Sequence, residues 1–239
     1  MKTSDRRYWA IRSDKKEIPL LFPELQKGRL RQGWGWDASQ DLRLLQAEID
    51  KGGAWWDRLT PDQTEAWPNL RMFSKSNDSI QLNNIVIIPN LPDDGFFCVA
   101  EVSGEYNFDP IESSNGEQNY GHILPVRLLT AKGVNKYAEG VAASIRSTLR
   151  TNRRMWNLDQ YNEDIDKLLE HIKAGGGLTT ASKGVERLGK AWEAALAHAA
   201  DVLQDKLGKE LNTRFQAAEW EEPIKIIIAN LYPAPGAKV

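Results

Sequence analysis

The order of hydrophobic and polar residues changes character near residue 131. Before that point, short apolar runs alternate with glycine, proline, asparagine and aspartate, which is typical of short strands joined by turns. The apolar runs predict strands at residues 8–12, 85–88, 96–102 and 123–129. Strands at this spacing indicate a small barrel or sandwich.

One helix is expected between the first and second of these strands. In residues 41–49, Leu42, Leu45 and Ile49 fall on one face of a helix. The sequence Lys51-Gly52-Gly53 follows directly and is a typical stop signal. The predicted strands therefore have a helix beside them.

After residue 130 the periodicity is helical. Apolar residues recur at spacings of three and four in residues 138–150, 161–172 and 182–211, and a further helix is expected over 215–231. Three glycines, 175–177, interrupt this pattern and predict a hinge or linker. The longest pattern suits a packed helix or a coiled-coil seam. We therefore expect an α+β fold in three parts: residues 1–131, 132–174 and 175–239.

Composition excludes several classes of protein. Hydrophobic residues make up 41% of the chain, too many for a wholly disordered protein. The 31 basic and 33 acidic residues exclude a uniformly basic coat for nucleic acid. A single cysteine excludes a disulfide framework, and three histidines leave little for a metal site. No apolar segment is long enough to span a bilayer and no signal peptide is visible, so the sequence predicts a cytoplasmic protein without membrane contact.

Common enzyme motifs are absent from the chain. It contains neither a Gly-x-x-x-x-Gly-Lys-Ser/Thr phosphate loop, nor a Gly-x-Ser-x-Gly elbow, nor a His-Glu-x-x-His pair. Cys98 lies in an apolar run, where an inert core thiol is expected. His122 precedes another such run and is interpreted as a structural histidine. The sequence therefore nominates no catalytic residue and no metal ligand.

Six of the nine tryptophans fall in the first 67 residues. Trp34 and Trp36 alternate with glycine in the segment 29–37, and in an extended segment they would point to the same side. Two indoles can sandwich a planar base, and Gln32 or Asp37 could bind its polar edge. The alternative, that both indoles fill the core of a barrel, carries equal weight. Trp156, Trp192 and Trp220 are expected in the core.

Basic residues crowd between residues 132 and 154, where six positive charges face one negative charge. Arg146, Arg150, Arg153 and Arg154 would share one face of a helix that runs this far. Such a stripe suits contacts to DNA phosphates, although a solvated helix face is the alternative. The predicted DNA-backbone contacts are Arg29, Arg31, Lys136, Arg146, Arg150, Arg153 and Arg154.

Several segments, taken in order, resemble the N-terminal PUA-like (EVE-like) modules of prokaryotic modification-dependent restriction proteins. The segments that carry the resemblance are Tyr8–Ile11, Gly28–Gly35, Ile85–Pro89, Ala100–Phe108 and His122–Arg127. Residues 147–158 resemble the connector of Mrr-type restriction endonucleases, and residues 215–239 resemble the helix that opens a PD-(D/E)XK nuclease domain. The chain departs from many of these relatives by carrying Asn83-Asn84 where they have Gly-Asp. The resemblance implies a PUA-like β-barrel with a flanking helix, followed by a helical region.

The same resemblance implies that the chain recognises a modified base in double-stranded DNA and flips the base into an aromatic pocket. The pocket residues that we predict are Trp34, Trp36, Gln32, Asp37, Trp56, Phe73, Ser74 and Asn107. The chain itself is expected to bind and not to cut, and to need no cofactor, since Mg²⁺ would serve only an attached nuclease domain. The C-terminal helices would form a homodimer or couple the module to that nuclease.

Two alternatives from other classes stay open. The chain could be an RNA-binding PUA-type protein, or a protein-interaction and oligomerisation module whose tryptophans form a groove. The modification also stays open among 5-methylcytosine, 5-hydroxymethylcytosine, a glucosylated base and N6-methyladenine.

Overall fold

The computed structural model describes residues 6–73, 78–151 and 153–182, and parts of a helix between residues 191 and 206. The chain divides into two compact units, Met1–Ser182 and Lys183–Val239. Almost all of the described residues belong to the first unit, and that unit carries the site discussed below.

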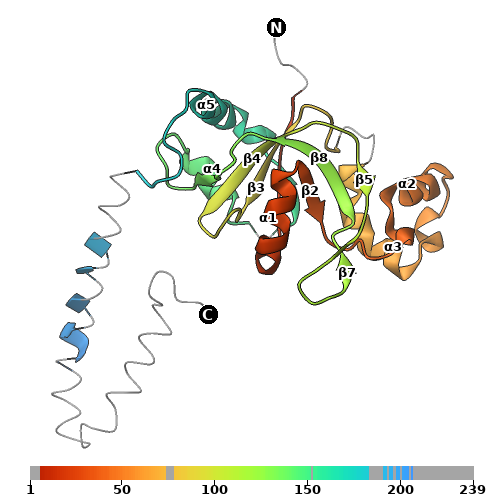
Figure 1. Cartoon of the computed structure of the whole chain (residues 1–239), viewed down its shortest axis with the longest axis horizontal. Coiled ribbons are helices and arrows are strands. Elements are labelled where there is room, and N and C mark those ends of the chain that lie inside the picture. Colours follow the sequence, from red (N-terminus) through yellow and green to blue (C-terminus); the bar gives the residue numbers. More distant parts are fainter. Residues whose placement is uncertain are drawn as a thin grey trace, which may run out of the picture. The chain divides into compact units, whose positions relative to one another are not determined.

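The first unit is built on a mixed sheet that curls into a half-barrel (Figure 1). Its main path has the strand order β10-β1-β3-β4-β8-β2, with β5 paired to β8 and β9 paired to β4. The strands are β1 (Tyr8–Ile11), β2 (Arg29–Gln32), β3 (Ile85–Pro89), β4 (Phe96–Val102), β5 (Asn107–Phe108), β8 (His122–Leu128), β9 (Val134–Asn135) and β10 (Met155–Asn157). A short ladder of β6 (Ile111–Glu112) and β7 (Gln118–Asn119) precedes β8.

Both faces of the sheet are covered, which explains the unbroken apolar run of β3. All five residues of β3 are buried. Val86 and Ile88 belong to one core cluster, whereas Ile85 and Ile87 belong to the other. Alternate residues of a strand point to opposite faces, so a strand covered on both sides has no polar positions. Among the strands that the structure describes, the one parallel pairing, between β1 and β3, lies in this doubly covered region.

The helices cover the two faces separately. On one side lie α1 (Ile18–Gln26), α2 (Leu42–Asp50) and α3 (Pro61–Ala66), and on the other lie α4 (Ala143–Thr148) and α5 (Asn162–Lys173) (Figure 1). Short 3₁₀ helices occupy Lys15–Glu17, Ala38–Gln40, Trp55–Arg58, Trp67–Met72 and Asp159–Tyr161. The predicted helix at residues 41–49 is confirmed as α2, with Leu42 and Leu45 buried.

The expected boundary after residue 131 is not present. The helix predicted at residues 138–150 is reduced to α4, because Gly140 adopts a positive φ of 89° and Ala142 is extended. After α4 the chain returns to the sheet as β10, which pairs with β1. Residues 132–157 therefore complete the sheet and belong to the same unit as the strands before them.

The later helices agree with the sequence only in part. α5 is confirmed, with Ile165, Leu168 and Leu169 buried, and Gly175 follows it with a φ of 73°. Trp156 is buried as predicted, but Trp192 is 67% exposed, which contradicts the core position expected for it. The described residues after Ser182 supply no second element against which that helix face could pack. The predicted helix at 215–231, with Trp220, lies outside the described residues.

No helix in the described part of the chain combines the length and the apolar character that crossing a membrane requires.

Cys98 is the inert core thiol that its position predicts. It is fully buried on β4, its Sγ lies 3.5 Å from the Leu91 carbonyl oxygen, and burial raises its pKa to about 12. We expect the native protein to leave a thiol-disulfide exchange reagent unreacted at mildly alkaline pH, since the thiolate is the nucleophile. Unfolding in guanidinium should release one reactive thiol per chain. Fast reaction without denaturant would contradict the buried position.

Candidate functional site

A pocket of about 590 Å³ lies where β1, β2 and β7 end. It brings together aromatic, cationic and amide side chains from segments that are distant in the sequence. The lining residues are Arg12, Ser13, Asp14, Leu21, Arg31, Gln32, Gly33, Trp34, Trp36, Asn119, Tyr120 and Arg154. This volume is in the range of small-molecule sites and is large enough for one nucleotide.

The structure unites part of the predicted pocket. Gln32, Trp34 and Trp36 line it, together with Arg31 and Arg154, which were predicted to contact the DNA backbone. Four of these five side chains, all but that of Arg154, come from the short segment 31–36 at the end of β2. Their closeness in the sequence accounts for most of this agreement.

Three of the remaining predicted pocket residues, Asp37, Phe73 and Asn107, lie elsewhere. Asp37 is an exposed N-cap whose carboxylate accepts a hydrogen bond from the Ser39 amide (2.8 Å), and this bonding lowers its pKa. Phe73 packs against Tyr106, with ring centroids 5.5 Å apart. The Asn107 Oδ1 accepts from the Phe108 amide (2.8 Å) on an exposed strand end.

Two further residues were predicted in the pocket, Trp56 and Ser74. Trp56 belongs to a separate aromatic cluster with Trp55 and Trp67. Ser74 lies outside the described residues.

Trp34 is held in an unusual backbone conformation. Its φ is 63°, in the left-handed region that costs a non-glycine residue about 1–2 kcal/mol. The Trp34 amide donates to the Asn119 Oδ1 (3.0 Å), and the neighbouring Gly33 carbonyl accepts from the buried Asn69 Nδ2 (2.8 Å). Strain that surrounding contacts hold in place is typical of ligand-binding sites.

His122 fixes the other side of the same segment. This fully buried residue donates through its Nε2 to the Trp34 carbonyl oxygen (2.8 Å). Its Nδ1 accepts from the Tyr106 hydroxyl (2.9 Å), and that hydroxyl accepts from the Leu42 amide (3.2 Å). Burial lowers the pKa of His122 to about 4, so the ring is neutral at pH 7 and the donor and acceptor roles are fixed. The prediction of a structural histidine is confirmed, and the structure it supports is the Trp34 segment.

The exposed ring of Trp34 carries a cation. Trp34 is 40% exposed, and the Arg154 Cζ lies 3.1 Å from its ring centroid. The Arg154 Nη1 also reaches the Asn69 Oδ1 at 3.4 Å. Burial lowers the pKa of Arg154 to about 10, which still leaves the guanidinium charged at neutral pH. The aromatic face that could stack on a base is thus covered by a positive charge.

Gln32 forms a fixed wall of the pocket. Its Nε2 donates to the carbonyl oxygens of Arg12 (3.3 Å) and Arg31 (3.1 Å). This pair of bonds orients the buried amide, and no described residue donates to its Oε1. The Oε1 of Gln32 is therefore a hydrogen-bond acceptor with free capacity at the pocket.

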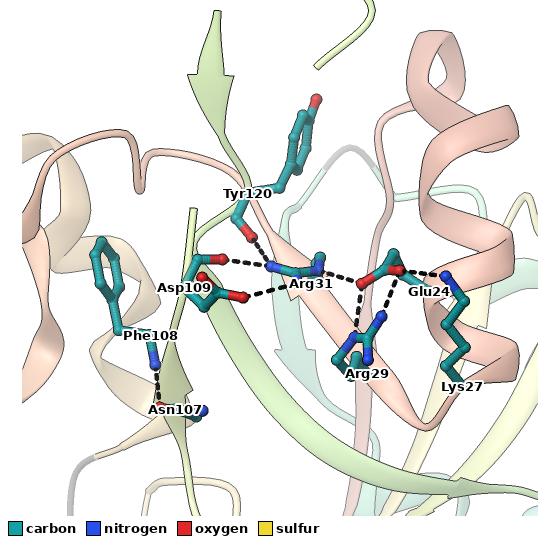
Figure 2. A network of polar contacts seen from close by, with 8 residues as sticks. All are labelled: Glu24, Lys27, Arg29, Arg31, Asn107, Phe108, Asp109 and Tyr120. Carbon is teal, nitrogen blue, oxygen red and sulfur yellow. Dashed lines mark hydrogen bonds and ion pairs between the residues drawn. The ribbon is translucent and has the colours of Figure 1, made fainter. Parts of the chain in front are cut away.

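Arg29 and Arg31 were predicted to contact DNA phosphates, but both guanidinium groups are bound to a carboxylate of the same chain. Glu24 on α1 accepts from both guanidinium groups, through Nε and Nη2 of Arg29 (2.7 and 2.6 Å) and Nε of Arg31 (2.7 Å). Lys27 adds a bond of 3.1 Å to the same carboxylate. Figure 2 shows Arg31 between Glu24 on one side and Asp109 and Tyr120 on the other. Arg31 is only 3% exposed, so it braces the pocket wall.

The single arginine face predicted after residue 145 does not form. Because α4 ends at Thr148, only Arg146 of the four arginines is helical, and its Nη1 donates to the Val141 carbonyl oxygen. Arg150 and Arg153 are exposed in the segment after α4, and Arg154 alone among the four lines the pocket. Lys136 lies after β9, with its Nζ 5.3 Å from the Tyr137 ring centroid.

Sequence reasoning missed one half of the pocket. Arg12, Ser13 and Asp14 follow β1, Asn119 is the last residue of β7, and Tyr120 follows it. The Tyr120 hydroxyl donates to the Asp14 Oδ2 (3.2 Å), which ties these two segments together. These residues carry no local motif. Only the pairing of strands brings them next to Gln32 and Trp34.

The described lining of the pocket is poor in acidic side chains. Asp14 is its only carboxylate among the described lining residues, and that carboxylate accepts from the Tyr120 hydroxyl and from the Lys16 amide. Within the described residues, no group of three or more His, Cys, Asp or Glu side chains could hold a metal ion.

No protein-family model matches the chain, and no curated protein matches it closely.

Proposed function

We propose that residues 6–182 are a PUA-like (EVE-like) module that binds double-stranded DNA and takes one modified base into the pocket beside Trp34 and Trp36. The observation that supports this proposal is the pocket lining itself. Two indoles, an oriented glutamine amide and the guanidinium of Arg154 meet in a space of about 590 Å³. Aromatic faces with a few polar groups are the means by which flipped bases are bound.

The free energy gained by stacking a flipped base is similar to the free energy that flipping costs. Flipping a base from the duplex costs a few kcal/mol, and stacking on an aromatic side chain returns about 1–3 kcal/mol. A rigid Trp34 loses little entropy on binding, because the hydrogen bonds of His122 and Asn119 already fix its backbone. Gln32 would accept a hydrogen bond from the exocyclic amine of a cytosine or adenine through its Oε1.

The biological role that we propose is recognition of foreign modified DNA in a restriction system. The chain would supply specificity, and cleavage would belong to an attached nuclease domain that uses Mg²⁺. Cleavage of modified DNA by this chain with Mg²⁺ would contradict the assignment of cleavage to another domain. The proposal places the protein in the cytoplasm, where such DNA arrives.

The decisive experiment compares one labelled duplex with a single central base that is unmodified, 5-methylated, 5-hydroxymethylated, glucosylated or N6-methylated. We expect tighter binding of one modified duplex in fluorescence anisotropy. Trp34→Ala should weaken that binding by about 5- to 150-fold, the equivalent of one lost base stack of about 1–3 kcal/mol. Trp34 is exposed, so the variant should fold.

The matched control is Leu44→Ala, which removes an exposed apolar side chain on α2 outside the pocket. It should leave binding unchanged. Equal binding of all duplexes, together with no effect of Trp34→Ala, would refute the proposed function. Displacement of the duplex by structured RNA would favour the RNA-binding alternative. Affinity that does not fall with salt would favour the protein-interaction alternative.

A further inference from the structure

A second hollow of about 520 Å³ adjoins the pocket and shares Arg154 with it. It is formed by the 3₁₀ helix Trp67–Met72 and by the start of β10. Its lining residues are Trp67, Pro68, Leu70, Arg71, Asp78, Arg153, Arg154 and Met155. Because Arg154 lines both spaces, a ligand in the first can continue into the second without leaving the surface.

The second hollow is positively charged. Arg71 and Arg153 are exposed, and no described acidic side chain forms an ion pair with either of them or with Arg154. Among the described lining residues the one carboxylate is that of Asp78, which is exposed and whose Oδ1 lies 3.8 Å from the Nη1 of Arg7. Three guanidinium groups that form no ion pair with a described residue meet in one hollow, and this arrangement favours an anionic ligand with more than one contact point.

Trp67 provides a fixed aromatic surface at this hollow. It is 39% exposed, yet its ring is packed by two neighbours. Trp55 stacks on it with centroids 6.5 Å apart, and Trp56 meets it edge-on at 5.5 Å. Neighbours on two sides limit the rotation of the indole, so it would lose little entropy when a ligand stacks on it. An arginine-rich groove with a rigid indole is the composition of single-strand nucleic-acid sites.

The position of Arg154 links the two hollows mechanically. Its guanidinium lies over one face of the Trp34 ring, with the Cζ 3.1 Å from the ring centroid. A base that stacks on this face must displace it. Since Arg154 also lines the second hollow, the displaced guanidinium can remain bound to an anion there.

We propose that the second hollow binds the nucleotide next to the flipped one, with its base against Trp67 and its phosphate between Arg153 and Arg154. This inference rests on the proposed function and extends it, because it makes the ligand a stretch of strand longer than one nucleotide. The second site reads no modification. It adds affinity and holds the strand on one side of the flipped base.

The test uses the full chain with two labelled duplexes, the tightest-binding modified duplex of the panel and its unmodified counterpart. Trp67→Ala should weaken binding of both duplexes by about 5- to 150-fold and leave their affinity ratio unchanged. Trp67→Phe, which keeps an aromatic face and guards against a folding defect, should recover part of the loss. Trp34→Ala, by contrast, should lower the affinity ratio.

A charge variant tests the phosphate contact separately. Arg153→Gln should reduce the slope of log affinity against log salt by about one. The control is Arg58→Gln, because Arg58 is paired with Glu48 and lies outside both hollows. If Trp67→Ala and Arg153→Gln bind like the parent protein while Trp34→Ala loses the preference, the inference is wrong and the proposed function stands. If no variant and no modification matters, the proposed function itself has failed.

Discussion

Replacing Glu24 with glutamine is expected to lower the free energy of unfolding by about 3–5 kcal/mol. Glu24 is 7% exposed, and its carboxylate accepts hydrogen bonds from Lys27, Arg29 and Arg31. A glutamine of the same shape has no charge, and its amide nitrogen would face guanidinium donors. Arg31 would then be a buried cation whose remaining carboxylate contact, the Asp109 Oδ2, lies 3.6 Å away. Removing one partner of a buried pair is costly for this reason.

Urea unfolding at neutral pH measures the effect. The matched control is Glu48→Gln, which breaks surface ion pairs with Lys51 and Arg58 and should change stability little. The pH dependence gives a second check. Arg29, then Arg31 and Lys27, hold the pKa of Glu24 far below its ordinary value. The stabilisation is therefore complete above the unfolded pKa of about 4.3 and is lost as pH falls through the folded pKa, so the two proteins should converge in strong acid. A loss no larger than that of the control would show that Arg31 does not depend on Glu24.

Glu24→Gln also connects stability to the pocket. Arg31 holds the carbonyl oxygens of Asp109 (2.6 Å) and Tyr120 (3.1 Å), and Tyr120 lines the pocket. A displaced Arg31 would release the segment after β7. We therefore expect weaker DNA binding by the variant even at temperatures where it remains folded.

The sequence predicts those strands and helices whose buried residues form an uninterrupted run or one regular apolar face. β3, β4 and β8 are long apolar runs, and α2 and α5 have one apolar face, so local periodicity determines each of them. β2 has the sequence Arg-Leu-Arg-Gln and gives no such signal. It is a strand because it pairs with β8 over four residues and because Glu24 neutralises its arginines. β10 likewise depends on its pairing with β1.

The candidate site was predictable only within one segment. Gln32, Trp34 and Trp36 are close in sequence and meet in the pocket, although Trp34 is not extended as the same-side argument assumed. Asp37 is near in sequence but turns away to cap a 3₁₀ helix. The pairing of β2 with β8 brings Asn119 and Tyr120 to the pocket, and the pairing of β1 with β10 brings Arg12 beside Arg154. These pairings join residues far apart in the sequence, which no local sequence pattern predicts. For the same reason, the sequence around Phe73 and Asn107 could not show that their side chains lie outside the pocket.

Acidification is expected to destabilise the protein through His122. Burial lowers its pKa from about 6.5 to about 4. The hydrogen bond to the Trp34 carbonyl and, after it, the charge of Asp41 oppose this shift of the pKa, whereas Arg154 reinforces it. A folded-state pKa below the unfolded value means that the unfolded chain binds a proton first as pH falls. The stabilisation from a neutral His122 is thus fully present above about pH 6.5 and is lost between about pH 6.5 and pH 4. The loss should reach about 2 kcal/mol at about pH 5.

Other groups also titrate in this range, so the comparison with a variant is what isolates His122. In His122→Gln, the side-chain amide can still donate to the Trp34 carbonyl, but it cannot take up a proton. We expect this variant to be less stable at neutral pH, because the Tyr106 hydroxyl loses its acceptor, and to lack about 2 kcal/mol of the acid destabilisation. His171→Gln lies on α5, away from this network, and should lose as much stability on acidification as the parent protein.

The protonation of His122 should also affect DNA binding, because its ring holds the backbone of Trp34. A proton on Nδ1 would convert the acceptor for the Tyr106 hydroxyl into a donor, and the chain from Leu42 through Tyr106 to Trp34 would break. Binding of the preferred duplex should therefore weaken below about pH 5 in the parent protein and much less in His122→Gln. NMR titration of the imidazole nitrogens measures the same event directly. A midpoint near the ordinary value of about 6.5 would show that His122 is not buried in the way described here.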